Sequence, residues 1–291
     1  MQKTLGFIGL GVMGFPMAGH LATKGYKVSV FNRTLKKSQD WIKEHNGTLC
    51  ESLPKLAESS EVIFLCVGND DDVGNIINGD DGIINYLKPG TILIDHTTTS
   101  AELPVELNKS LHLKKVSFLD APVSGGQAGA ESGILSVMVG GNKESYKNVK
   151  EIIGAYSKFI KYMGESGSGQ LTKMVNQICI AGLIQALAEG INFSDEVGLN
   201  TKDVIEVISK GAAQSWQMEN RWETMINNEY NHGFAVDLMR KDLDIVLEKA
   251  KKNNISIDIT KIINDYYKDI QNAGGGSLDT SSLLKRIKDL I

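Results

Sequence analysis

The chain has little cysteine and no strong excess of charge of either sign. Cys50, Cys66 and Cys179 are odd in number and widely spaced, which disfavours a disulfide framework and indicates reduced, buried thiols in a cytoplasmic protein. The net charge of −4 gives no reason to expect nucleic acid or a membrane surface as a partner. The five histidines show no ligand spacing, so we expect no metal site.

The sequence also indicates neither a long apolar run nor an N-terminal targeting signal. We expect no membrane-spanning segment, because we identify no apolar run of sufficient length. The first strand should begin near Thr4, which leaves no room for a signal or transit peptide. A length of 291 residues, with 42% hydrophobic and 23% charged residues, predicts about two globular domains.

A glycine-rich turn follows the first expected strand, residues 5–8, and precedes an expected helix that ends at Gly25 and leads to a second strand over 27–31. This strand–turn–helix–strand context favours a dinucleotide-binding turn over a plain structural turn. One glycine permits the tight turn, the second lets the pyrophosphate approach, the third allows close helix packing, and the helix N-terminus faces the phosphates. The predicted cofactor-binding residues of this turn are Gly9, Leu10, Gly11, Val12, Met13 and Gly14.

The end of the second expected strand bears on the choice of dinucleotide. An NAD enzyme carries Asp or Glu there for the ribose hydroxyls, whereas this chain has Asn32, Arg33 and Thr34. A guanidinium can pair with a 2′-phosphate, and the missing carboxylate would remove a repulsion against it. We therefore predict NADP(H) as the preferred cofactor. The alternative is that Arg33 stacks on the adenine and NAD(H) is also used.

Further strands are expected over residues 62–67, 91–95, 116–121, 135–139 and 159–162. Parallel sheets place ligands at the C-terminal ends of their strands, so Val67, Asn69 and Thr98 are candidate cofactor contacts, although a threonine run also caps helices. Ser124, Gly125 and Gly126 would offer a hydroxyl and backbone N–H groups to a small carboxylate. A lone motif of this kind is also found in structural turns.

One proline-free helix is expected from about Gly167 to Gly198, with apolar residues around most of its circumference, so we expect it to be buried on most sides. Lys173, Asn176 and Gln177 share one face at i, i+3 and i+4. They predict either a lined cavity or a helix end with a solvated lysine.

After the long helix only helical patterns follow, over 201–209, 211–225, 236–251, 259–270 and 280–290. The fold class predicted is an α/β Rossmann domain with a mostly parallel sheet over 1–163, followed by an all-α domain over 164–291 and joined to it by the long interdomain helix. Burial of so apolar a helix suggests a homodimer or homotetramer.

Four motifs in order carry a resemblance that covers essentially the whole chain. Residues 7–18 resemble the opening signature of the β-hydroxyacid dehydrogenase family, which contains 3-hydroxyisobutyrate dehydrogenase, tartronate semialdehyde reductase and the glyoxylate/succinic semialdehyde reductases. Residues 120–126 resemble its substrate motif, Gly167-x-Gly169-x-x-x-Lys173 its catalytic motif, and Lys241-Asp242-Leu243 its C-terminal cofactor-side motif.

The resemblance implies an NAD(P)-dependent enzyme that interconverts a small 3-hydroxy acid and its semialdehyde. Lys173 would be the general acid/base, Ser124, Gly125 and Gly126 would hold the substrate carboxylate, and Asn176 or Gln177 would orient the substrate or the lysine. Thr98, Phe234 and Lys241 would lie near the nicotinamide.

Two departures leave the substrate open. Gln177 stands where the family often has a second Asn and resembles the tartronate semialdehyde reductase branch, so an NADPH-dependent semialdehyde reductase is the alternative. His96-Thr97-Thr98-Thr99 replaces the usual Met-Ser-Thr.

Three other protein classes share this architecture. A 6-phosphogluconate dehydrogenase is disfavoured because its C-terminal domain is much larger. A non-enzymatic dinucleotide-binding scaffold and an imine reductase are disfavoured because such relatives lack or replace the lysine found here at position 173.

Overall fold

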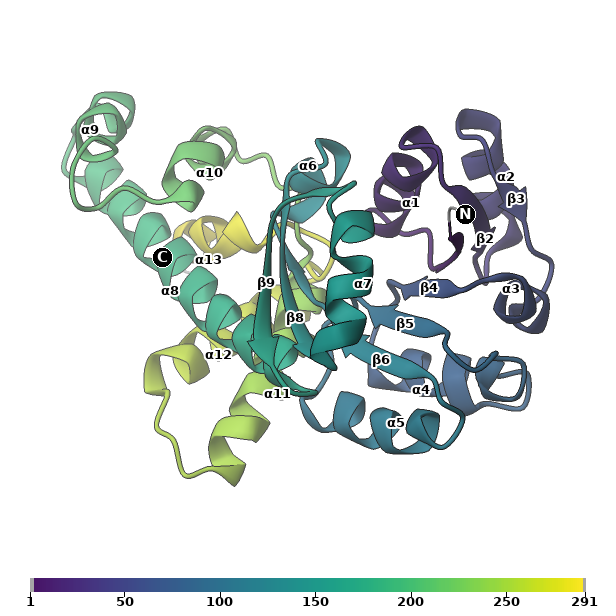
Figure 1. Cartoon of the computed structure of the whole chain (residues 1–291). Helices are drawn as coiled ribbons and strands as arrows, with labels where there is room; N and C mark the ends of the chain where they lie inside the picture. The colour runs from purple at the N-terminus through teal and green to yellow at the C-terminus, as the bar shows by residue number, and fades with distance from the viewer. Residues whose placement is uncertain (1–2, 290–291) are drawn as a thin grey trace. The chain divides into compact units, whose positions relative to one another are not determined.

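The computed structural model describes residues 3–289 and divides into two compact units. The N-terminal unit extends to Lys173 and the C-terminal unit starts at Met174. The division falls inside helix α8 (Ser168–Glu196), which continues from one unit into the other (Figure 1). The boundary predicted from the sequence, between residues 163 and 164, lies before this helix.

The N-terminal unit is built on one mixed sheet. Its strands, among the described residues, are β1 (Thr4–Ile8), β2 (Lys27–Phe31), β3 (Thr48–Leu49), β4 (Val62–Leu65), β5 (Ile92–Asp95), β6 (Ser117–Asp120), β7 (Val123–Ser124), β8 (Leu135–Gly141) and β9 (Ser157–Gly164). The order is β3-β2-β1-β4-β5-β6-β8-β7, with β9 paired to β8. Pairing is parallel from β3 to β6, antiparallel for β8 with β6 and β7, and parallel for β8 with β9. The predicted, mostly parallel Rossmann sheet is confirmed.

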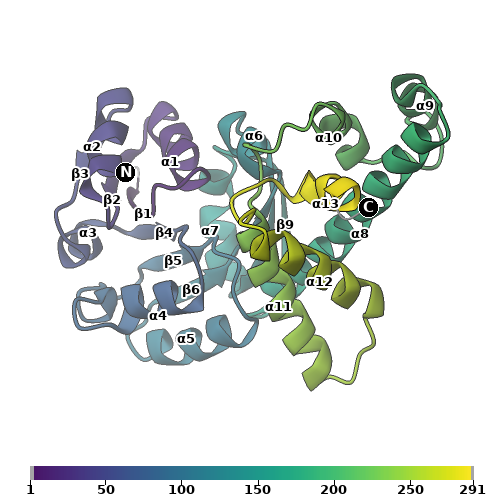
Figure 2. The same ribbon diagram turned by 180° about the vertical axis from the view of Figure 1, so that it is seen from behind.

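Alternating side chains of the central strands fill two separate cores. On β4, Val62 and Phe64 belong to one core, whereas Ile63 and Leu65 belong to the other. Because such strands are buried on both faces, successive residues are apolar and form a continuous apolar run in the sequence. Helix α7 lies over one face, and α4 and α5 over the opposite face (Figures 1 and 2). The helices of this unit before α8 are α1 (Gly14–Thr23), α2 (Leu35–Glu44), α3 (Leu53–Ser59), α4 (Asp70–Asn78), α5 (Glu102–His112), α6 (Gly126–Glu131) and α7 (Lys143–Ile153).

The C-terminal unit is helical, as predicted. It contains the rest of α8, α9 (Thr201–Ile208), α10 (Trp216–Ile226), α11 (Val236–Lys252), α12 (Asp258–Asn272), a 3-10 turn (Thr280–Ser282) and α13 (Leu283–Asp289). Its core includes Ile184, Ile191, Met239, Leu243 and Tyr267. The terminal helix predicted over 280–290 therefore begins as a 3-10 turn, and its last predicted residue, Leu290, lies outside the described residues.

Helix α8 is buried on most sides, as expected, but not on all of them. One stripe of the helix carries exposed side chains at Leu171, Val175, Cys179 and Leu183, four residues apart. Repeats of four follow one face of a helix, so packing partners cover only the other faces. Cys179 is exposed and Cys50 and Cys66 are half-buried, which corrects the expectation of buried cysteines.

The prediction that no apolar segment is long enough to span a bilayer is wrong. Helix α8 is long and apolar enough to do so, but 44% of its most apolar window is buried inside the structure. A buried core helix of a soluble protein meets the same criterion.

The start of α8 can be tested by a pair of glycine substitutions on the same helix. A Cβ at Gly169 would lie 2.5 Å from the carbonyl oxygens of both Asp120 and Met138, whereas a Cβ at Gly182 meets nothing within 4 Å. We expect Gly169→Ala to lower the free energy of unfolding by about 1–3 kcal/mol, as overpacking does. Gly182→Ala should raise it by roughly 0.5–1 kcal/mol. Calorimetric melting of both variants checks this, and an unchanged Tm for Gly169→Ala would contradict the close approach.

Candidate active site

The glycine-rich turn between β1 and α1 has the shape that a phosphate requires. Gly9 has φ +97°, and a Cβ there would lie 2.2 Å from the carbonyl oxygen of Cys66. A Cβ at Gly14 would lie 2.0 Å from the carbonyl oxygen of Gly9. At Gly11, by contrast, nothing lies within 4 Å of the Cβ position, so the turn is open there. Gly9 and Gly14 therefore close the turn, and Gly11 leaves room for a dinucleotide pyrophosphate.

Asn32 at the end of β2 braces this turn. The backbone N–H of Leu10 donates to Asn32 Oδ1 at 2.8 Å, and Asn32 Nδ2 donates to the carbonyl of Thr34 at 3.1 Å. The side chain thus joins the glycine-rich turn to the segment that carries Arg33. Asn32, predicted as a cofactor contact, therefore also supports the turn.

The carboxylate of Asp72 lies beside Arg33, although the residues directly after β2 include no acid. Arg33 is 90% exposed, and its Nη1 lies 3.5 Å from Asp72 Oδ1. Asp72 Oδ2 accepts the backbone N–H of Gly68 at 3.2 Å, while Asn69 caps α4 by accepting the N–H of Asp72. The expected absence of an acid at this place is therefore corrected, because α4 supplies it. The run Asp70-Asp71-Asp72 after β4 was the available signal.

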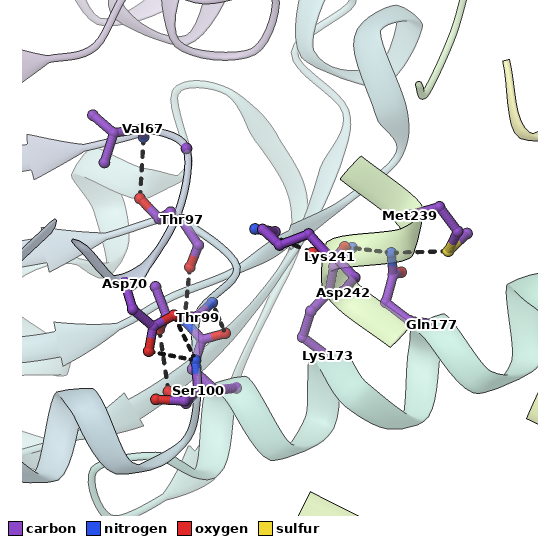
Figure 3. Close-up of polar contacts among 12 residues, drawn as sticks. Val67, Asp70, Thr97, Thr99, Ser100, Lys173, Gln177, Met239, Lys241 and Asp242 are labelled. Carbon is purple, nitrogen blue, oxygen red and sulfur yellow. Dashed lines mark hydrogen bonds and ion pairs between the residues drawn. The ribbon is translucent and has the colours of Figure 1, made fainter. Parts of the chain in front are cut away.

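The segment after β5 is tied to its neighbours by hydrogen bonds (Figure 3). The N–H of Thr97 donates to Asp95 Oδ1 at 2.9 Å, and Thr97 Oγ1 accepts the N–H of Val67 at 3.1 Å. The N–H of Ser100 donates to both carboxylate oxygens of Asp70, at 3.0 and 3.1 Å. Thr98 lies half-buried between these anchored residues. Val67 and Thr98 therefore come to the same edge of the sheet, as expected.

His96 has a structural place within the same unit. Its Nδ1 lies 2.6 Å from the carbonyl oxygen of Ala121 and its Nε2 lies 2.8 Å from the hydroxyl of Tyr156. Burial lowers the pKa of His96 to about 4, so the ring is neutral at physiological pH. Nδ1 then donates to the carbonyl, and Nε2 accepts from the tyrosine hydroxyl. The unusual histidine is thus accounted for by buried hydrogen bonds.

Lys173 is buried, and its Nζ donates to the carbonyl of Val123 at 2.9 Å. Val123 and Ser124 form β7, and the next two residues, Gly125 and Gly126, have φ +136° and +62°. These values lie in the region that favours glycine. The first half of the candidate substrate motif therefore contacts the lysine. Gly126, the last residue of the candidate carboxylate-binding set, is already the first residue of α6.

Asp120 anchors the start of the helix that carries Lys173. Its carboxylate accepts the backbone N–H of Gly167 at 2.9 Å and of Gln170 at 3.0 Å. Burial raises the pKa of Asp120 to about 6, against the lowering effect of these N–H donors. Asp120 and Gln170 are both fully buried. Neither was assigned a role from the sequence, although Asp120 opens the motif that also contains Ser124.

The C-terminal unit brings together four of its own polar side chains. Asn176 Nδ2 donates to Gln177 Oε1 at 2.8 Å, and Gln177 Nε2 donates to Asp242 Oδ2 at 2.7 Å (Figure 3). Lys241 Nζ lies 3.2 Å from Asp242 Oδ1. Asp242 is 2% exposed, and the sequence alone indicated no role for it. It is the residue that joins the predicted Gln177 and Lys241.

Phe234 is held by a different set of contacts in this unit. Its N–H donates to Asp279 Oδ2 at 2.8 Å, and its carbonyl accepts the N–H of Thr280 at 2.9 Å. Its half-buried ring packs on the helical core. The backbone at Phe234 is therefore fixed by the segment that precedes α13.

Comparisons with known proteins agree with this architecture. Residues 4–164 match the model of the NAD binding domain of 6-phosphogluconate dehydrogenase, and residues 167–287 match that of the NAD-binding domain of NADP-dependent 3-hydroxyisobutyrate dehydrogenase. An uncharacterized oxidoreductase of Shewanella frigidimarina is 50% identical over 97% of each chain. The 2-(hydroxymethyl)glutarate dehydrogenase of Eubacterium barkeri is 31% identical over 98% of this chain and 95% of its own.

A solved structure extends the similarity to the whole fold. The 3-hydroxyisobutyrate dehydrogenase of Salmonella typhimurium superposes with a TM-score of 0.87 at 26% identity, covering 98% of this chain and 99% of that one. The Rossmann sheet, its glycine-rich turn and these matches define a nicotinamide-dinucleotide oxidoreductase. Within that class, the chain belongs to the β-hydroxyacid dehydrogenase family.

The raised pKa of Asp120 has a consequence for stability. Because the folded pKa, about 6, exceeds the ordinary value of 3.8, the folded state holds this proton more tightly than the unfolded state. The resulting stability is fully present below about pH 4 and is lost as the pH rises through 6, in total about 3 kcal/mol. We expect the carboxyl resonance of Asp120 to titrate near pH 6 in NMR spectra. Titration at or below its ordinary value would contradict this, and Asp120→Asn identifies the resonance.

Proposed function

We propose that this protein is an NADP(H)-preferring dehydrogenase that interconverts a small 3-hydroxy acid and its semialdehyde, as 3-hydroxyisobutyrate dehydrogenase does, with Lys173 as general acid/base. The observation that carries the proposal is the buried Lys173 Nζ, hydrogen-bonded at 2.9 Å to the carbonyl of Val123 beside Ser124. A buried amine next to a candidate anion-binding segment is an arrangement suited to proton transfer.

The residues of the chain divide the work of this reaction. A bound nicotinamide dinucleotide would supply or accept the hydride. Ser124 with the backbone of Gly125 and Gly126 would bind the substrate carboxylate. The Lys173 ammonium would donate a proton to the aldehyde oxygen in reduction, and the neutral amine would accept a proton from the hydroxyl in oxidation. The carbonyl of Val123 supports this assignment, because it holds Nζ in place beside Ser124.

A second candidate is an NADPH-dependent reductase of glyoxylate, succinic semialdehyde or tartronate semialdehyde. It is favoured by Gln177, whose carboxamide is held by Asp242 in place of the shorter Asn that the family often has. A screen of 3-hydroxyisobutyrate, glyoxylate, succinic semialdehyde and tartronate semialdehyde, followed by nicotinamide absorbance with both cofactors, decides between them. Turnover of the aldehydes alone would favour the reductase.

Removal of Lys173 tests the proposed acid/base. We expect Lys173→Ala to fold, to bind NADPH normally and to lose roughly 10²–10⁴ in kcat, which is what general acid catalysis contributes. Lys173→Arg should rescue little, because a guanidinium does not release its proton. Steady-state kinetics and fluorescence titration with NADPH measure both quantities. An alanine variant that keeps more than about a tenth of the wild-type kcat would exclude this role.

Arg33 and Asp72 together test the cofactor preference. If Arg33 pairs with the 2′-phosphate, Arg33→Asp should weaken NADPH binding about tenfold to a hundredfold and leave NADH binding nearly unchanged. Asp72→Asn removes the charge 3.5 Å from Arg33, so it should strengthen NADPH binding by a few-fold. Calorimetric titration of both cofactors provides the ratio. A wild-type protein that binds NADH more tightly would refute the preference.

A further inference from the structure

Gln170 makes a pair of hydrogen bonds that connects α8 with the segment after β5. Its side-chain Nε2 donates to the carbonyl of Thr97 at 2.7 Å, and its Oε1 accepts the N–H of Thr99 at 3.1 Å. The residue is fully buried. Its two partners flank Thr98, and Gln170 itself lies three residues before Lys173 on the same helix.

The pair of bonds requires a side chain with one donor and one acceptor on the same planar group. A carboxamide has both, whereas a carboxylate has only acceptors and an aliphatic chain has neither. Because the site is buried, a lost partner leaves a backbone group of Thr97 or Thr99 unsatisfied. The backbone N–H of Gln170 is in turn held by Asp120, so the main chain that carries this carboxamide is also fixed.

Other contacts of the segment lie at its two ends. Thr97 is bound to Asp95 and Val67, and Ser100 is bound to Asp70. These contacts fix the two ends of the segment against β4, β5 and α4. The contacts of Gln170 fix its middle against α8, the element that carries Lys173.

We propose that Gln170 is a positioning residue that holds Thr98 and Lys173 in a constant geometry, by clamping the backbone on both sides of Thr98 to α8. The proposal rests on the proposed function for its effect on catalysis, since Thr98 and Lys173 act there at the nicotinamide and on the proton. The clamp itself is a property of the folded chain and can be measured without turnover.

Three variants distinguish the hydrogen bonds of the Gln170 side chain from its contribution to packing. Gln170→Met has a similar shape but makes neither hydrogen bond, and Gln170→Ala also leaves a cavity. Gln170→Glu reproduces both bonds when the introduced carboxyl is protonated, because its hydroxyl donates and its carbonyl accepts, and it loses the donor when ionised. Burial favours the protonated form, as does the neighbouring carboxylate of Asp120.

We expect kcat of Gln170→Met to fall about tenfold to a hundredfold at every pH, as small misplacements of reacting groups do. Gln170→Glu should show a similar loss at alkaline pH and recover as the pH is lowered. NADPH affinity should change less than kcat. The pH profiles of kcat are compared as the ratio of variant to wild type, because other titratable groups on the surrounding elements are common to both proteins and cancel in this ratio. These groups are Asp70, Asp95, His96, Asp120 and Lys173. A Gln170→Glu ratio that stays as low as that of Gln170→Met even at acid pH overturns the proposal.

Hydrogen exchange provides the readout that is independent of activity. The amide of Thr99 should be protected in the wild type and in Gln170→Glu at low pH, and it should exchange faster in Gln170→Met, while the amide of Ser100, held by Asp70, serves as the internal control. Equal protection of Thr99 in wild type and Gln170→Met overturns the clamp. Loss of protection with unchanged kcat overturns its positioning role. If wild-type protein turns over no substrate of the screen, the proposed function fails while the exchange result still decides the clamp.

Discussion

The buried carboxylate of Asp120 at the end of β6 is the contact on which the N-terminal half of the candidate site depends. The first N–H groups of any helix lack partners within the helix, and those of α8 are buried against the sheet. Asp120 accepts two of them, from Gly167 and Gln170. The helix can approach this closely only because Gly169 has no Cβ to meet the carbonyl oxygens of Asp120 and Met138. Glycine at position 169, in the motif Gly167-x-Gly169-x-x-x-Lys173, is therefore a packing requirement.

The position of Lys173 follows from this contact. Lys173 lies one turn beyond the anchored residues, and its Nζ bonds to Val123, three residues after Asp120 in the chain. A single short segment, residues 120–124, thus holds both the start of α8 and the side chain of its lysine. Two motifs that are far apart in the sequence are thereby joined by direct hydrogen bonds.

The features that were predictable from the sequence are those set by local patterns. Apolar runs such as residues 62–65 located the central strands, and the glycine-rich turn, the long helix and the helical second half followed from spacing and turn residues. The exposed apolar stripe of α8 was not predictable, because periodicity shows that a face is apolar but not whether another element covers it. Partners distant in sequence were missed for a related reason. Nothing local pairs Arg33 with Asp72, Gln170 with Thr97, or Gln177 with Asp242.

The amide side chains of the C-terminal unit show how one buried charge determines the direction of several hydrogen bonds. Asp242, when ionised, can only accept, so Gln177 must turn its Nε2 toward it. Its Oε1 then faces Asn176, which must donate through Nδ2. An Asn at position 177 would be one methylene shorter, so its carboxamide would lie closer to the backbone than the carboxamide that makes both contacts here. The extra length of Gln177 therefore serves the internal hydrogen bonding of this unit, and the orientation of Asn176 depends on it.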